Sequence, residues 1–378
     1  MPSEKWNALF VSFFAQFSFL FALQSVPPLL PTLIKEFGLR YAAASSLMWL
    51  VALPGVLLAM LGGSLTEKYG VKPLAIIGTA IMTLSSALCF FSASVASLQI
   101  GRFFLGVGGA IVVVSVPVLI LQWFEKAELG TAMGVFGLTM PVAVVASFNT
   151  QAIIASDYGW RTAFLVASVV NALSLGFCVL TTERRTASNG KNTLTSLRSL
   201  NIWMLGGVWM LFNMAAVGYS TWGKTIFTGY GLPAGTADLL ASTLMLGTLA
   251  TPLTGLISDR VGGRRRPFII LASLAMFLLF PAFAFVHARF LILVGLTLGL
   301  LIAFLPPSVF ALPEEILGEG KGAIGWGVLS AFMNLGFILG PLSLGYVLDS
   351  SSGTSMVFFS LSLFGLAALI LAILLRSR

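Results

Sequence analysis

Charged side chains are scarce in this sequence. Asp, Glu, Lys and Arg make up 9% of the 378 residues and hydrophobic residues 58%, whereas a soluble domain typically carries about 25% charged residues. The shortage excludes an ordinary soluble protein. Runs of roughly 20 apolar residues predict membrane-spanning helices, because such segments satisfy their backbone polar groups internally. The apolar-polar alternation of a lipid-facing β-barrel does not occur.

Residues that carry metal or nucleophilic chemistry are equally scarce. The two cysteines, Cys89 and Cys178, lie in separate apolar runs, and the single histidine, His287, falls in a short predicted loop. Neither a disulfide framework nor a Cys/His metal cluster is indicated. No nucleophile-base pair and no phosphate-binding Gly-rich loop can be identified. We therefore expect no enzyme, no catalytic residue, no metal site and no cofactor.

Twelve apolar segments are candidate spans, and the first, which contains the run from Leu9 to Leu30, is long enough to remain as a helix rather than a cleaved signal. A polar stretch splits them six and six, which predicts an N-terminal bundle over 1–182, a cytoplasmic linker over 183–201 and a C-terminal bundle over 202–378. Prolines at the end of span one and inside span ten predict bends. The twelve predicted spans are 6–31, 42–64, 73–93, 97–119, 129–153, 161–181, 202–227, 236–258, 267–286, 290–312, 321–348 and 354–375.

The distribution of basic residues predicts the orientation. Most of the 21 Lys and Arg residues fall on one side of the membrane if the N-terminus is cytoplasmic, as the positive-inside rule requires. Both termini are then cytoplasmic, and the net charge of +8 reflects topology rather than a nucleic-acid partner. We expect a monomer that contacts the lipid bilayer in the cytoplasmic membrane of a prokaryote.

Two loops share one pattern. The segment 63–72 reads GSLTEKYGVK and the segment 255–264 reads GLISDRVGGR, so both follow Gly-x-x-x-acid-base-x-Gly-x-base. The repetition predicts two homologous halves, an arrangement that places a substrate site near the bilayer midplane at their interface.

These features resemble the major facilitator superfamily of secondary transporters. Its hallmark loop joins the second and third helices and recurs between the eighth and ninth. The run RFFLGVGGA, which begins at Arg102, resembles the fourth-helix motif of the family, and Gly336-x-x-x-Gly340-Pro341 resembles a helix-packing motif. Span five departs from the drug-antiporter form, because Met140 stands where that motif has glycine. The run 158–161 weakly resembles cyanate-permease-like members.

The resemblance implies an all-α integral membrane fold of two six-helix bundles that transports by rocker-switch alternating access. It also implies that the repeated loops form a gate. An acid at the cytoplasmic end of its helix can meet the positive end of a neighbouring helix dipole, and its basic neighbours can latch the two halves. The predicted gating residues are Gly63, Glu67, Lys68, Lys72, Gly255, Asp259, Arg260 and Arg264.

Polar residues inside the spans are the candidates for substrate binding. Arg102 and Lys224 are the two basic ones. Charged residues within a membrane are costly and are therefore functional candidates. Alternatively, Lys and Arg near helix ends can extend their charged groups to the membrane interface. Uncharged residues at helical spacing would line the cavity, unless they serve only as interhelical hydrogen bonds. The predicted substrate-binding residues are Gln16, Gln24, Arg102, Asn213, Ser220, Lys224, Trp326 and Asn334.

Acidic residues are absent from the middle of every predicted span, since Asp238 and Asp349 lie at outer helix ends. Proton-coupled transporters usually need a titratable carboxylate in the pathway. Coupling through a buried carboxylate is therefore not expected, and basic residues without internal counter-ions favour a small anionic solute. The family resemblance disfavours a nitrate-type function, because nitrate carriers resemble one another in arginines in the second and eighth spans and in a Gly/Asn-rich fifth span, and here spans two and eight lack arginine.

Two alternatives stay open. An exporter of hydrophobic or amphipathic compounds would account for the 31 phenylalanines, although such residues more often face lipid or neighbouring helices. A non-transporting receptor or scaffold would not need two copies of the gate loop.

Overall fold

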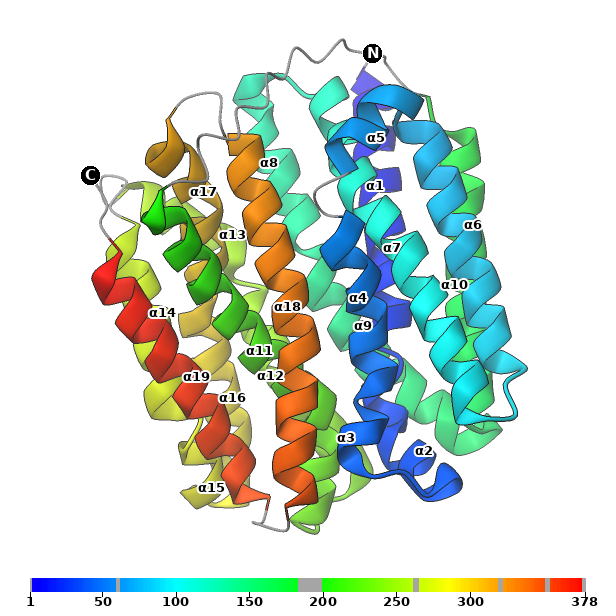
Figure 1. Ribbon diagram of the computed structural model, residues 1–378, viewed down its shortest axis with the longest axis vertical. Coiled ribbons are helices and arrows are strands. Elements are labelled where there is room, and N and C mark those ends of the chain that lie inside the picture. The colour runs from blue at the N-terminus through cyan, green and yellow to red at the C-terminus, as the bar shows by residue number, and fades with distance from the viewer. Residues whose placement is uncertain are drawn as a thin grey trace. The chain divides into compact units, whose positions relative to one another are not determined.

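In the computed structural model, residues 2–58, 62–182, 199–260, 265–318, 322–350 and 354–375 are described, and the side chains of a few residues beside these gaps are not. The regular elements among them are all helices (Figure 1). Eleven of the described helices are long and apolar enough to cross a membrane. The chain is therefore an all-α, multi-pass membrane protein, as the composition predicts.

The helices form two compact units. The first holds residues 1–39 and 46–189, and the second holds residues 40–45 and 190–378. The predicted bundle boundaries at residues 182 and 202 stay a prediction, because most of the linker lies outside the described residues.

Long apolar helices build the first unit. Within it α6 packs on α7 and α10, and α1 packs on α7, α9 and α10. Its elements are α1 (Pro2–Leu23), η1 (Pro27–Leu29), α2 (Leu30–Phe37), α4 (Ser46–Leu58), α5 (Gly62–Tyr69), α6 (Val71–Phe90), α7 (Val95–Trp123), α8 (Lys126–Gly137), α9 (Thr139–Tyr158) and α10 (Trp160–Leu180).

The second unit is organised around α11, which packs on α12, α18 and α19. Figure 1 shows α19, in red, beside α14, and the two helices are in contact. The elements are α3 (Tyr41–Ala44), α11 (Leu200–Gly229), α12 (Ala234–Thr248), α13 (Thr251–Arg260), α14 (Arg266–Leu279), α15 (Ala282–Phe285), η3 (Ala288–Phe290), α16 (Leu291–Ile302), α17 (Leu305–Leu317), α18 (Gly322–Asp349) and α19 (Ser355–Leu374).

Proline breaks two of the spans where the sequence predicts bends. At the end of span one, α1 stops at Leu23 and the chain continues through η1 into α2. In span ten, α16 ends at Ile302 and α17 begins at Leu305, immediately before Pro306 and Pro307. Because proline lacks an N–H and is tolerated in the first turn of a helix, both breaks follow from its chemistry. The predicted bends are confirmed.

The second predicted span, 42–64, is divided in the structure. The short helix α3 precedes α4, which carries Pro54 and ends at Leu58, before three residues that lie outside the described part of the chain. At 13 residues α4 is a shorter apolar helix than the eleven candidate spans.

A carboxylate of α18 holds α3 within the second unit. The backbone N–H groups of Tyr41 and Ala42 donate to the two side-chain oxygens of Asp349, each at 2.9 Å. The ring of Tyr41 also packs edge-on against Trp222 of α11, with ring centroids 5.7 Å apart. Asp349 thus satisfies the first N–H groups of α3, which have no intrahelical acceptor.

Candidate functional site

Arg102 lies on α7 with its side chain fully enclosed, at 1% exposure. Its Nη1 and Nη2 atoms donate to the carbonyl oxygens of Ala22 and Leu23, both at 2.7 Å, and its Nε atom donates to that of Leu47 at 2.6 Å. Ala22 and Leu23 end α1, where carbonyls lack intrahelical donors and carry the negative end of the helix dipole. Arg102 therefore caps α1 and ties it to α4.

Glycines of the same motif allow this close approach. A Cβ atom at Gly106 would collide with the backbone of Val51 on α4, and one at Gly109 would collide with the ring of Phe19 on α1. Both glycines follow Arg102 on α7, so the helix that carries the guanidinium can lie against both helices that supply its carbonyl partners. The motif RFFLGVGGA thus has a packing role in the first unit.

Lys224 pairs with a carboxylate that sequence reasoning missed. Its Nζ atom lies 2.9 Å from Oδ2 of Asp238, and the two side chains are 12% and 5% exposed. The expectation that basic residues in the spans lack internal counter-ions is therefore wrong for Lys224. A signal for the pair was present: α11 ends at Gly229, five residues after Lys224, and α12 begins at Ala234, four residues before Asp238. Similar distances from one turn put both side chains at similar depth in a helix hairpin.

The second carboxylate oxygen of Asp238 does not take part in the ion pair. Oδ1 is buried and has no hydrogen-bond partner among the described residues. An ionised carboxylate can accept hydrogen bonds at both oxygens, and a buried acceptor without a donor is costly. The ion pair is thus only half satisfied on its acidic side.

The other predicted residues of α11 bond within their own helix. Nδ2 of Asn213 donates to the carbonyl oxygen of Trp209 at 2.7 Å, and Oγ of Ser220 donates to that of Ala216 at 2.9 Å. Both side chains are buried. They occupy the helix stripe that leads to Lys224, because positions 213, 220 and 224 recur at helical spacing. A role in binding stays a prediction for both.

On α18, Trp326 and Asn334 are less enclosed. Trp326 is 45% exposed and stacks on Phe310 of α17 with centroids 4.6 Å apart, while Phe310 also meets Trp209 of α11 at 4.9 Å. Nδ2 of Asn334 donates to the carbonyl oxygen of Ser330 at 2.9 Å. Three helices of the second unit therefore share one aromatic cluster.

Two predicted glutamines of the first unit differ in their surroundings. Nε2 of Gln16 donates to Oγ1 of Thr139 on α9 at 3.1 Å. Gln24, just past the end of α1, is fully buried, and neither polar atom of its amide has a hydrogen-bond partner among the described residues. Buried polar atoms are nearly always paired with protein or water, so this amide is a candidate for binding water or a solute.

Gln151 on α9 has a buried amide like that of Gln24, and it was not among the predicted substrate-binding residues. It is fully buried, and both polar atoms of its amide lack a partner among the described residues. One turn earlier, Oγ of Ser147 donates to the carbonyl oxygen of Phe21 on α1 at 3.3 Å. The sequence signal was a stripe of Thr139, Ser147 and Gln151 at helical spacing.

The first gate loop spans α5 and the start of α6. Gly63, Glu67 and Lys68 lie in α5, where Lys68 is exposed and its ammonium lies 5.1 Å from the centroid of the Tyr69 ring; the side chain of Glu67 is outside the described set. Nζ of Lys72 donates to the carbonyl oxygen of Thr181, the residue that caps α10, at 2.7 Å. Lys72 thus contacts a helix end of its own unit.

The second gate loop is described only in part. Gly255, Asp259 and Arg260 lie in α13, and Arg260 is exposed, whereas the Asp259 side chain and all of Arg264 fall outside the described residues. The adjacent Arg265, which was not predicted, pairs with Glu315 of α17 at 3.1 Å.

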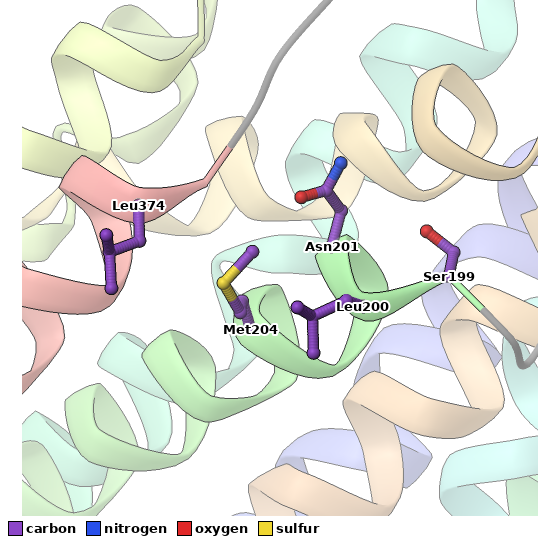
Figure 2. A pocket seen from close by; sticks show the side chains of 5 residues that line it. All are labelled: Ser199, Leu200, Asn201, Met204 and Leu374. Carbon is purple, nitrogen blue, oxygen red and sulfur yellow. The ribbon is translucent and has the colours of Figure 1, made fainter.

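A hollow of about 490 Å³ lies at one end of the second unit. Figure 2 shows its lining side chains, Ser199, Leu200, Asn201 and Met204 at the start of α11 and Leu374 at the end of α19. Met204 precedes Lys224 by twenty residues of one helix, which is roughly 30 Å along the axis. The hollow is therefore separate from the Lys224–Asp238 pair.

Comparison with known proteins identifies the kind of protein that this fold represents. The chain is an all-helical, multi-pass membrane protein of two helical units, and the family model of the Major Facilitator Superfamily matches its residues 12–279 and 204–378. The chain therefore belongs to the Major Facilitator Superfamily, whose members are transporters, and its fold is the major facilitator fold.

Curated relatives resemble it over nearly the whole chain. A probable sulfoacetate transporter of Cupriavidus necator is 24% identical, over 90% of this chain and 86% of the relative. A lysosomal dipeptide transporter of Danio rerio is 25% identical, over 96% and 83%. A probable nitrate transporter of Staphylococcus carnosus is 26% identical, over 91% and 89%. The named solutes are small, and two of the three are anions.

Proposed function

We propose that this protein carries a small anionic solute across the cytoplasmic membrane of a prokaryote by rocker-switch alternating access, with both termini in the cytoplasm. The observation that carries the solute class is Lys224. Among the described residues, its ammonium has one partner, a carboxylate oxygen 2.9 Å away, so it retains donors that an anion could occupy.

The two basic residues within the spans take different roles in this proposal. Lys224 binds the anion directly. The three N–H groups of Arg102 that bond to carbonyls are committed to α1 and α4. Arg102 therefore acts as a positioning residue, which holds the end of α1 beside Gln24. Gln16, Gln24, Asn213, Ser220, Trp326 and Asn334 complete the proposed lining.

The relatives support an anion as the solute. Sulfoacetate and nitrate are anions, and a dipeptide has a terminal carboxylate, so each of these named solutes presents a negative group that an ammonium can bind. The segments of spans two and eight contain no arginine, and a resemblance to nitrate carriers would require arginines in these two spans. We therefore propose an organic anion, carboxylate or sulfonate, ahead of nitrate.

The test is a ligand screen followed by transport. Purified protein is heated with sulfoacetate, nitrate, acetate, a dipeptide or a lipophilic cation, because a ligand of the folded state raises the apparent unfolding temperature. An anion that stabilises the protein should then show counterflow in reconstituted vesicles. Stabilisation by the lipophilic cation alone would support an exporter of amphipathic compounds and contradict the proposal.

Lys224→Ala should raise the solute concentration for half-maximal counterflow by roughly tenfold or more, since a hydrogen bond to a charged group contributes about 1.5–3 kcal/mol. Lys5→Ala is the matched control, because Lys5 pairs with Glu128 near the exposed end of α1. An unchanged half-saturation in Lys224→Ala would remove Lys224 from the binding site.

A further inference from the structure

A buried carboxylate with one unused oxygen lies beside the proposed anion-binding lysine. Asp238 is 3% exposed, its Oδ2 faces the Lys224 ammonium at 2.9 Å, and its Oδ1 has no partner among the described residues. We propose that Asp238 carries the coupling proton: protonation at Oδ1 neutralises the carboxylate and releases Lys224 to bind the solute anion.

Charge balance is the reason for the coupling. An uncompensated ammonium buried in a membrane protein is costly, so Lys224 needs a negative partner at every stage of the cycle. Without solute, the Asp238 carboxylate supplies that charge. When a proton from the aqueous side adds to Asp238, the solute anion takes over the role. When the proton leaves on the other side, the carboxylate returns to Lys224 and the anion is released, so one proton and one anionic charge cross together.

The surroundings leave Asp238 as the available acid. Besides Lys224, α11 carries Tyr219, whose hydroxyl donates to the carbonyl oxygen of Leu240 at 2.7 Å, and Tyr230 follows its last residue. The other elements that pack on α11 or α12 include α15, α16, α17, α18 and α19, and α15, α16 and α19 contain no titratable residue.

On α18, Tyr346 is 63% exposed, and both oxygens of Asp349 accept backbone N–H groups of Tyr41 and Ala42. On α17, Glu315 pairs with Arg265, and the Glu314 side chain lies outside the described set. Tyr41 meets α11 through its ring. Of the carboxylates described in these elements, Asp238 alone combines burial with an unused oxygen.

This inference rests on the proposed anion transport, and the experiment separates the two. The full chain is reconstituted in vesicles, and the anion that gives counterflow in the screen of sulfoacetate, nitrate and acetate is the probe. Absence of counterflow for all of them would defeat the proposed function itself. Counterflow by the wild type that is unaffected by a pH gradient would defeat only the proton-carrying role of Asp238.

Asp238→Asn mimics the protonated residue. We expect at least a tenfold loss of pH-gradient-driven accumulation, larger than any loss of counterflow measured at equal pH on both sides. The solute concentration for half-maximal counterflow should rise with pH in the wild type, because binding requires the protonated acid, and should not change with pH in Asp238→Asn. Gradient-driven accumulation that survives in Asp238→Asn would show that the pair is only a structural link between α11 and α12.

Asp349→Asn is the matched control, since this carboxylate is already committed to α3, and it should keep the gradient-driven accumulation. If Asp238→Asn fails to fold, wild-type transport that is unaffected by the pH gradient still overturns the proposal. If Asp238→Asn folds, the anion should raise its unfolding temperature equally at pH 6 and pH 8. In the wild type, the anion should raise the unfolding temperature more at pH 6 than at pH 8.

Discussion

The two basic side chains of the spans are neutralised in different ways. Arg102 gives three hydrogen bonds to backbone carbonyls, two of them at the end of α1, where the helix dipole is negative. Lys224 instead pairs with one carboxylate oxygen. Carbonyls at a helix end cannot change charge, whereas a carboxylate can. This difference makes Arg102 suited to a fixed position and Lys224 suited to exchange of partners.

Arg102→Leu should destabilise the protein strongly. It leaves three buried carbonyl oxygens without their donor, and each lost bond costs about 1 kcal/mol or more, so we expect a loss on the order of 3 kcal/mol and a much lower unfolding temperature. The stability of Arg102→Lys should lie between that of Arg102→Leu and that of the wild type, because one ammonium cannot reach both helices. Exposed Arg289 provides the control: Arg289→Leu should change stability by about 0.5 kcal/mol or less.

The thermal unfolding of these variants in detergent measures the effect. Arg102→Leu with wild-type stability but lost solute binding would show that the guanidinium binds the solute directly rather than positioning α1.

At the scale of the elements, glycine and proline decide where helices end. Gly70 separates α5 from α6 with φ of 85° and ψ of 163°, a conformation that side chains strongly disfavour. The second glycine of the hallmark loop is therefore explained by its backbone. Pro306 and Pro307 act similarly in span ten, because they lie in the first turn of α17 and cannot continue α16.

Gly70→Ala should lower stability by roughly 1–3 kcal/mol, the cost of holding an ordinary residue in this conformation. Gly134→Ala in α8 is the matched control, because nothing lies within 4 Å of its added Cβ and its φ is not positive; alanine should there stabilise the helix by up to about 1 kcal/mol. The unfolding temperatures of both variants provide the measurement. Equal stability of Gly70→Ala and the wild type would contradict the conformational requirement.

At the scale of the whole molecule, the repeated loops are proposed to control the exchange between access states. Their acids, Glu67 and Asp259, occupy equivalent positions in the two copies of the pattern. If they stabilise one access state, their loss changes the rate of exchange more than the affinity for solute.

We expect Glu67→Gln and Asp259→Asn to change the counterflow rate by roughly 2- to 30-fold, the effect of about 0.5–2 kcal/mol on a barrier. The half-saturating solute concentration should stay within twofold. Glu128→Gln, which removes only an exposed pair with Lys5, is the control and should leave the rate unchanged. A variant with weaker binding and an unchanged rate would count against the gate.

The sequence by itself determined the class of the protein. Low charge and long apolar runs are local properties, and burial in lipid requires a helix wherever they occur, so the all-α membrane fold and most span positions could be predicted. The loop pattern and the Arg102 motif likewise indicated the family. The bends at Pro27, Pro306 and Pro307 were predictable because proline acts on its own turn.

Only the tertiary structure decided which polar groups meet. Asp238 looked like a residue at a helix end, yet the α11–α12 hairpin brings it to Lys224 and buries it. The sequence did not distinguish Gln151 from the other amides. In the structure, α9 packs on α1, and the Gln151 amide is buried without a hydrogen-bond partner among the described residues. Such pairings depend on contacts between helices, and periodicity along one helix carries no information about the depth and rotation of its neighbour.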